Sequence, residues 1–410
     1  MPSLVYMKHT AFLPILLLCL MIGSLTCKKD DFIERHWNHP IEPQGSPPES
    51  FTTLEAKLTP ESCGTCHIEQ FSFWKSSMHR DSASQGLRWQ LHGLGEKKSE
   101  NCFNCHSPLM ETRTLIKINE GWLENYPQIM NVYFPSDSSE HGISCATCHV
   151  RNHTRYGPTP LNKGIQDKKS VHLGFRVQNE FESSQFCKKC HESKEDADRV
   201  SNKKMMETYT EWESSDYKRK GIQCQTCHMP NRNHLWKGIH DKEMVLSGIE
   251  KQIFLKAVDD EIEISAELRS TNIGHKFPTY VVPKIYLKLY LQSQKLGKKP
   301  IGDYTIGRLM DIHLTKEFYD NRLDPGESVL ITAKMSREEL KKFESVIFEA
   351  DVQPDELYER MFSYNLENNE SLGHSQDTLN KIQESLLQKQ KSKYKLFRLI
   401  SPISDLISDK

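Results

Sequence analysis

The sequence contains the stretch Cys63-Gly64-Thr65-Cys66-His67, in which two cysteines are separated by two residues and followed directly by a histidine. Four further stretches repeat the pattern: Cys102-Phe103-Asn104-Cys105-His106, Cys145-Ala146-Thr147-Cys148-His149, Cys187-Lys188-Lys189-Cys190-His191 and Cys224-Gln225-Thr226-Cys227-His228. These five motifs use ten of the 12 cysteines in the chain of 410 residues. The pattern Cys-x-x-Cys-His is typical of covalent attachment of c-type haem.

The spacing within each motif matches the chemistry of haem attachment. Two thiols add to the two vinyl groups on one edge of the porphyrin, and the next residue offers an imidazole nitrogen to the iron. The sequence therefore predicts five c-type haems. The predicted attachment residues are Cys63, Cys66, Cys102, Cys105, Cys145, Cys148, Cys187, Cys190, Cys224 and Cys227, and the proximal iron ligands are His67, His106, His149, His191 and His228.

Three other uses of paired cysteines fit the pattern less well. Zinc ribbons pair two Cys-x-x-Cys knuckles but place no fixed histidine directly after each. Thioredoxin-like redox motifs occur singly, at a turn between a strand and a helix. A disulfide scaffold would not require a histidine after every pair.

The N-terminus predicts export. Lys8 and His9 precede the apolar run 11–22, which is short for a membrane span and suits the core of a signal peptide at residues 1–27. Covalent haem attachment takes place after export, so the two predictions agree. Cys27 ends the stretch Gly23-Ser24-Leu25-Thr26-Cys27, which resembles a lipoprotein processing site but has Ser24 and Thr26 at the usual positions of Leu and a small residue. Ordinary cleavage into the periplasm and membrane anchoring through lipidated Cys27 both stay open.

Charge and hydropathy argue against a nucleic-acid-binding protein and against a transmembrane span after the signal peptide. The chain has 54 basic and 55 acidic residues and no basic block, so we expect no nucleic-acid partner. After the signal peptide no apolar run of about 18 residues follows, so no further transmembrane span is expected.

Composition divides the rest of the chain into four parts. Residues 28–57 are polar and proline-rich and predict a linker, and residues 58–245 hold all five motifs in a helical, loop-rich pentahaem domain. Residues 250–355 lack cysteine and show alternating apolar residues at 262–268 and 285–291, a turn at 323–327 and strands at 328–333 and 346–352. They predict a β-sandwich-like domain, which makes the fold α+β overall. Residues 356–410 predict a helical C-terminal tail.

The sixth ligand of each iron decides between electron transfer and chemistry at an open site. Of the 18 histidines, eight outside the motifs are candidates for this position: His79, His92, His141, His153, His172, His234, His240 and His275. Eight candidates for five positions favour bis-His ligation. Met110 and Met229 are the alternatives, since a thioether also binds haem iron.

Several segments resemble the cytochrome c-554-like multihaem family, which is related to hydroxylamine oxidoreductase-type haem arrays. They are the first motif with Trp74, Ser77 and His79, the segment 142–151, the segment 211–217 leading into 221–230, the histidines His172 and His240, and the segment 272–279 with His275. The resemblance covers residues 60 to about 355. It implies that His79, His172, His240 and His275 are distal ligands and that the β domain packs against the haem array. His153 and His92 are reserves for the remaining position.

Three functions remain open at this point. The first is an electron carrier that passes electrons between redox proteins, or from membrane quinol-linked donors, and has no catalytic residues. The second is an oxidoreductase that acts on a small nitrogen or sulfur compound at one five-coordinate haem. Pentahaem nitrite reductases carry a lysine-ligated haem, whereas all five motifs here end in His. The third is a module whose β domain binds a partner while the haems conduct electrons.

Overall fold

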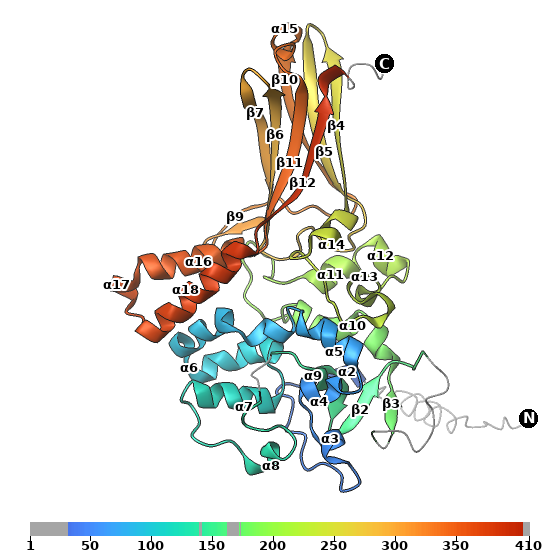
Figure 1. Cartoon of the computed structure of the whole chain (residues 1–410), viewed down its shortest axis with the longest axis vertical. Helices are drawn as coiled ribbons and strands as arrows, with labels where there is room; N and C mark the ends of the chain where they lie inside the picture. Colours follow the sequence, from blue (N-terminus) through green and yellow to red (C-terminus); the bar gives the residue numbers. More distant parts are fainter. Residues whose placement is uncertain (1–31, 139–141, 162–171, 173, 405–410) are drawn as a thin grey trace, which may run out of the picture. The chain divides into compact units, whose positions relative to one another are not determined.

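The computed structural model describes residues 32–138, 142–161, 172 and 174–404. The chain divides into an N-terminal unit up to Asn38, of which helix α2 (Phe32–His36) is described, and a second unit that begins at His39 (Figure 1). The predicted signal peptide and Cys27 lie outside the described residues. Within these residues, no helix is both long and apolar enough to cross a membrane.

The haem motifs lie in short helices of the second unit. Four of them occupy the last turn of a helix, namely α6 (Gln85–His106), α9 (Cys145–His149), α10 (Gln185–His191) and α13 (Cys224–His228). The first begins in α4 (Pro60–Gly64) and ends just after it. Residues three and four apart in a helix share one face. This geometry turns the two cysteines and the histidine of a motif toward the same side.

The other elements of this region are short and are joined by loops. They are α3 (Thr53–Ala56), α5 (Ile68–Lys75), η1 (Arg80–Ala83), α7 (Met110–Asn119), α8 (Gln128–Asn131), η3 (Asn179–Glu182), α11 (Thr208–Glu213), α12 (Asp216–Arg219), η4 (Pro230–Arg232) and α14 (Lys242–Ser247), with a small sheet of β1 (Val150–Arg151), β2 (Thr154–Gly157) and β3 (Phe175–Val177).

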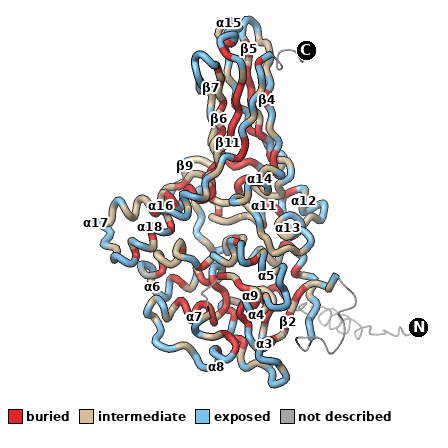
Figure 2. The backbone as a smooth tube through the Cα atoms, viewed as in Figure 1, coloured by how far each residue is buried: buried red, intermediate tan, exposed pale blue. Residues whose placement is uncertain are grey.

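Two antiparallel sheets form the β domain. One has the order β10-β5-β4 and the other the order β12-β11-β6-β7. The strands are β4 (Ile249–Val258), β5 (Glu261–Ser270), β6 (Lys284–Ser293), β7 (Gly297–Ile306), β10 (Ser328–Ser336), β11 (Ser345–Gln353) and β12 (Tyr394–Pro402). Buried side chains of both sheets form one core, to which Leu268, Leu289 and Phe348 belong. Figure 2 shows this core as buried stretches of β5, β6 and β11. The predicted α+β class and the four predicted strands are confirmed.

The predicted turn at 323–327 is present. Its Glu327 N–H donates to the carbonyl oxygen of Asp324 over 2.9 Å, and Gly326 has φ +85° between them. This positive φ favours glycine, and Pro325 at the preceding position suits the same turn type. Outside the two sheets, β8 (Arg308–Met310) pairs with β9 (Glu317–Asp320), and α15 (Arg337–Leu340) links β10 to β11.

The prediction of a helical C-terminal tail is only partly right. Residues 356–391 do form helices α16 (Glu356–Glu367), α17 (Asn369–Leu372) and α18 (Gln376–Lys391). Residues 394–402, however, are strand β12, which pairs with β11 along the sandwich. Leu396 and Phe397 of this strand are buried in the core. The Lys/Gln/Leu-rich composition of helix α18 predicts helix for this part of the chain. Strand β12 is not predicted, because its pairing partner β11 lies in the β domain.

The linker prediction for residues 28–57 also needs correction. Ile41 is buried, and its backbone bonds both Pro108 and Met110, with N–O distances of 3.3 and 3.2 Å. The backbone N–H of Gln44 donates to the buried carboxylate of Glu111 over 3.0 Å. The residues from His39 onward are therefore packed against the haem region, since Ile41 is buried there and its backbone bonds Pro108 and Met110.

Candidate haem-binding sites

The histidine of a motif is held by its Nδ1 atom in four of the five cases. The partners are backbone carbonyl oxygens for His106 (Ser82, 2.7 Å), His149 (Tyr156, 2.8 Å) and His228 (Lys237, 2.6 Å), and the hydroxyl of Tyr280 for His191 (2.5 Å). An imidazole that donates from Nδ1 presents the lone pair of Nε2. This is the atom that a metal ion would bind.

A second histidine faces four of the motif histidines. The ring centroids are 6.5 Å apart for His67 and His172, 6.1 Å for His191 and His79, 6.0 Å for His149 and His234, and 6.2 Å for His228 and His275. In each pair the two rings come from segments that are far apart in the chain. Only folding brings them together.

The spacing of these pairs fits a metal ion between the rings. A first-row transition metal binds an imidazole nitrogen at about 2 Å, so two imidazoles on opposite sides of one ion have centroids about 6 Å apart. The residues present therefore fit a haem iron with two axial histidines, while the motif cysteines supply the covalent links to the porphyrin.

Burial favours the neutral form of four of these imidazoles. It lowers the pKa of His79 to about 3 and the pKa values of His149, His191 and His275 to about 4. A neutral imidazole is the form that binds a metal, because its Nε2 lone pair is free of a proton. The Nδ1 atoms of His79 and His172 are buried without a hydrogen-bond partner among the described residues.

Three of the five predicted distal histidines lie opposite a motif histidine. His79 comes from the segment between α5 and α6, His172 from the segment before β3, and His275 from the loop between β5 and β6 of the β domain. The structure thus brings together residues that the sequence analysis selected by resemblance.

The other two predicted distal ligands, His240 and His153, lie elsewhere. The Nε2 atom of His240 is 3.0 Å from the carboxylate of Asp355. The Nε2 atom of His153 is 2.9 Å from the carbonyl oxygen of Gly45, and its ring packs on Tyr133. Both Nε2 atoms bond to oxygen acceptors, and neither ring is paired with a motif histidine in the part of the chain that the structure describes, so a ligand role for these two residues stays a prediction.

His234 takes the position that the sequence analysis did not assign. It follows the fifth motif by six residues, yet it faces His149 of the third motif. Its Nδ1 atom is 2.9 Å from the carbonyl oxygen of Arg232, which leaves Nε2 toward His149. Its place in the loop directly after a motif was the one signal available. His141 and the side chain of His92 lie outside the described residues, so the structure gives no position for these two candidates.

Contacts between thiols connect the motifs to one another. The thiols of Cys63 and Cys145, of Cys105 and Cys190, and of Cys187 and Cys224 lie close enough to shift the pKa values of one another. Cys148 lies close enough to Cys187 and Cys190 to raise their pKa values, although burial and the direct thiol partners contribute more. All five motifs therefore belong to one contiguous cluster.

Two tryptophans position the third and fifth motifs in the same way. The indole N–H of Trp74 donates to the carbonyl oxygen of Ile143 over 2.7 Å, and that of Trp212 donates to Ile222 over 2.9 Å. Each acceptor stands two residues before the first cysteine of its motif. A serine three residues after each tryptophan closes the turn by donating to the tryptophan carbonyl. In each Trp-x-x-Ser segment the indole thus holds the loop that leads into a motif by one hydrogen bond.

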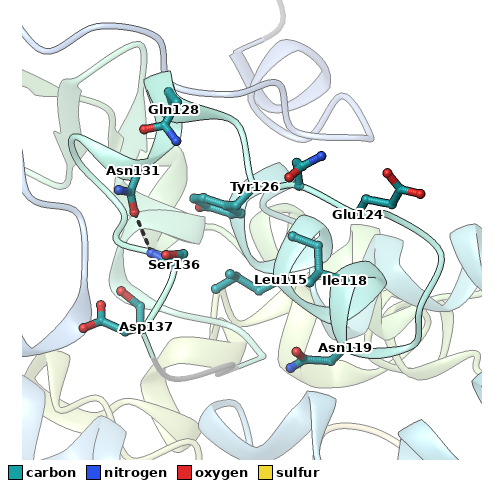
Figure 3. A pocket seen from close by; sticks show the side chains of 11 residues that line it. Leu115, Ile118, Asn119, Glu124, Tyr126, Gln128, Asn131, Ser136 and Asp137 are labelled. Carbon is teal, nitrogen blue, oxygen red and sulfur yellow. Dashed lines mark hydrogen bonds between the residues drawn. The ribbon is translucent and has the colours of Figure 1, made fainter.

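A cavity of about 500 Å³ lies apart from these motifs, between α7 and the loop around α8 (Figure 3). Polar side chains line most of it, and the Ser136 N–H donates to Asn131 over 2.8 Å at its wall. None of its lining residues belongs to a haem motif. The attachment motifs, rather than this cavity, define the cofactor sites.

Attachment motifs, paired neutral imidazoles and a mixed α+β fold define a multihaem c-type cytochrome, a class of electron-transferring haem proteins. Residues 62–125 match the family of cytochrome c554 and c-prime. The fold is similar to the crystal structure of a penta-heme cytochrome c552 from Thermochromatium tepidum, with a TM-score of 0.57 and 17% identity over 85% of this chain and 100% of that chain. No curated protein matches the chain.

Proposed function

We propose that this protein is an exported pentahaem c-type cytochrome that transfers electrons between redox partners through mostly bis-His haems. The observation that carries the proposal is the set of four imidazole pairs with centroids 6.0 to 6.5 Å apart. Two axial histidines fill both open positions of a haem iron, which favours electron transfer over binding of a substrate.

Five motifs in the sequence support the number of five haems, and so does the likeness in fold to a protein described as penta-heme. Attachment would use the ten motif cysteines, with His67, His106, His149, His191 and His228 as proximal ligands. His172, His79, His234 and His275 would be the distal ligands to four of these irons. The haems supply the redox chemistry, and the protein fixes their spacing and tunes their potentials.

The thiol contacts support a continuous electron route. Haems attached next to one another through Cys63 and Cys145, or through Cys187 and Cys224, would have neighbouring porphyrin edges. Contacts through Cys105, Cys148 and Cys190 would join the remaining haems to the same chain. An electron could then enter at one haem and leave at another without passing through solvent.

The enzyme alternative depends on the second motif. An oxidoreductase for a small nitrogen or sulfur compound needs one iron with an open sixth position. Among the described residues, no histidine ring is paired with His106. His141 and the His92 side chain, which lie outside that part of the chain, are the candidates to close this iron.

The partners of the carrier would be redox proteins or membrane quinol-linked donors, and no nucleic acid. Haem attachment after export and the apolar run at 11–22 support a periplasmic location for the mature protein, either free or anchored through lipidated Cys27. The mass of the N-terminal peptide of the mature protein separates these two forms, since lipidation adds acyl chains to Cys27.

Two measurements on the exported protein test the proposal. Mass spectrometry should show a gain of five haems, and any other gain contradicts the predicted number. Electron paramagnetic resonance of the oxidised protein should show low-spin ferric haem for all the paired sites. If one haem equivalent is high-spin and binds small ligands, the enzyme alternative replaces the carrier. If several are high-spin, the paired histidines are not axial ligands.

A further inference from the structure

The axial histidine of the fourth motif differs from the other motif histidines in its partner. The Nδ1 atom of His191 is 2.5 Å from the hydroxyl of Tyr280, whereas His106, His149 and His228 each face a backbone carbonyl oxygen. A hydroxyl can accept one hydrogen bond and donate another, whereas a carbonyl oxygen can only accept. The Tyr280 hydroxyl is therefore a relay and not an end point.

From Tyr280 a row of hydroxyl side chains continues to a buried carboxylate. The Thr208 side chain lies close enough to the Tyr280 hydroxyl to lower the pKa of Tyr280, against the larger effect of burial, and the hydroxyls of Thr208 and Thr279 are 2.8 Å apart. The Thr279 hydroxyl donates to Oε2 of Glu211 over 2.6 Å. Thr208 thus lies between Tyr280 and Thr279, so the three hydroxyls form a row from His191 at one end to Glu211 at the other.

The carboxylate at the end of this chain is buried but partnered. Glu211 is 9% exposed, and Arg322 Nη1 donates to its Oε1 over 2.9 Å. Burial raises the pKa of Glu211 above its ordinary value, against the lowering effects of Thr279, Arg322 and Lys276. The carboxylate is therefore subject to opposing effects of burial and of its hydrogen-bonding and charged partners.

The charged groups around Glu211 form an ion-pair network that reaches the surface. Arg322 binds Asp320 through two hydrogen bonds of 2.8 and 2.9 Å, and Asp320 bonds Lys203, whose side chain is 34% exposed. The titratable and charged groups that face Glu211 and Arg322 from the packed elements are Lys276, Tyr280, Asp320 and Glu207.

We propose that the chain Tyr280–Thr208–Thr279 transmits the charge of Glu211 to His191, and that reduction of the haem bound there is coupled to proton uptake by Glu211. A carboxylate hydrogen-bonded to a metal-binding imidazole makes that imidazole a stronger electron donor. Here the effect is relayed through three hydroxyls. The inference rests on the proposed function, because it requires a haem on the fourth motif.

The coupled step balances in charge and atoms. One electron from the redox partner enters the haem, and one proton from solvent adds to the Glu211 carboxylate to form the neutral acid. Proton uptake offsets the added negative charge next to the chain, so the reduced state is favoured at low pH. Tyr280, Thr208 and Thr279 act as positioning residues, since none of them exchanges an electron.

The test is a potentiometric titration of the full haem-loaded protein at several pH values. In the wild-type protein one resolved potential should fall as the pH rises through the ionisation of Glu211. Tyr280→Phe and Thr279→Val break the chain while leaving Glu211 in place, and each should raise that potential and remove its pH dependence. Glu211→Gln should do the same and leave the other potentials unchanged.

Two control variants test whether the effect is specific to the residues between His191 and Glu211. Glu213→Gln changes a carboxylate on the same helix that bonds Lys218 at the surface, and Tyr394→Phe removes a hydroxyl that bonds only the carbonyl of Ile239. Both should leave the potentials as in the wild type. If the pH dependence survives in Tyr280→Phe and Thr279→Val, the coupling is overturned. Haem mass and spin state separate this result from failure of the proposed function, which would show as missing or high-spin haem.

Discussion

The imidazole rings of His228 and His275 lie 6.2 Å apart, with their planes inclined by only 14°. His228 ends helix α13 of the haem region, whereas His275 lies in the loop between strands β5 and β6 of the β domain. The Nδ1 atom of each ring bonds a backbone carbonyl oxygen, so both Nε2 atoms are directed into the space between the rings. An iron in this space would join the two domains through its axial ligands.

Replacing His275 with Ala should therefore convert one haem to the high-spin state. The fifth motif keeps its cysteines and His228, so the haem stays attached but loses its sixth ligand. Electron paramagnetic resonance should show one new high-spin equivalent, with haem mass unchanged. His313→Ala is the control, because that histidine packs on Tyr364 far from any motif histidine in sequence and bonds none of them. An unchanged spin state in His275→Ala would exclude this residue as a ligand.

His234 and His153 provide a direct comparison between the fold and the sequence-based assignment. His234→Ala should open the iron bound by His149 and produce one high-spin equivalent. His153→Ala should leave the spin state unchanged and instead lower the free energy of unfolding by about 1 kcal/mol, because the half-buried carbonyl of Gly45 loses its partner. Spectroscopy and denaturant unfolding of both variants test this. A high-spin signal from the His153 variant alone would restore the sequence-based assignment.

Gly142 stands at a point of close approach next to the third motif. A Cβ atom there would lie 1.8 Å from the Ser82 side chain and 2.8 Å from the carbonyl oxygen of His106, which is backbone and cannot turn away. Gly142→Ala should therefore displace the chain around His106, destabilise the protein by about 1–3 kcal/mol and alter the spectrum of the second haem. Thermal unfolding and visible spectra measure both effects. Gly93→Ala, a helical position with open space around it, should be neutral or stabilising.

Acid should destabilise the haem region through its buried neutral histidines. Burial lowers the pKa values of His149, His191 and His275 to about 4 in the folded chain, against about 6.5 in an unfolded chain, and an iron bound at Nε2 would oppose protonation further. Below about 6.5 the unfolded state binds more protons, so the free energy of unfolding falls as the pH falls toward 4. Urea unfolding of the haem-loaded protein at pH 7, 6, 5 and 4 checks this, with low-spin absorbance as a second readout. Stability that stays constant over this range would contradict neutral burial.

Much of the β domain was predictable because alternation of apolar residues is a local signal. Ile262, Ile264 and Leu268 alternate with polar residues and line one buried face of β5, as predicted. Strand β12 was missed because its pairing with β11 depends on a partner distant in the chain. Composition predicts a linker at residues 28–57, whereas the burial of Ile41 and Gln44 depends on contacts with Pro108 and Glu111 that only the fold supplies.

The sequence by itself determined the cofactor, because attachment of c-type haem needs only two thiols and an imidazole within five consecutive residues. Each of the five motifs contains all of these groups, so the prediction does not depend on the rest of the chain. The tertiary structure decided which second imidazole faces each motif histidine. The second histidine needs only to reach the opposite side of the porphyrin ring, so it can come from any segment that packs there. Hence His234 meets His149, His275 meets His228, and His240 and His153 bond oxygen acceptors instead.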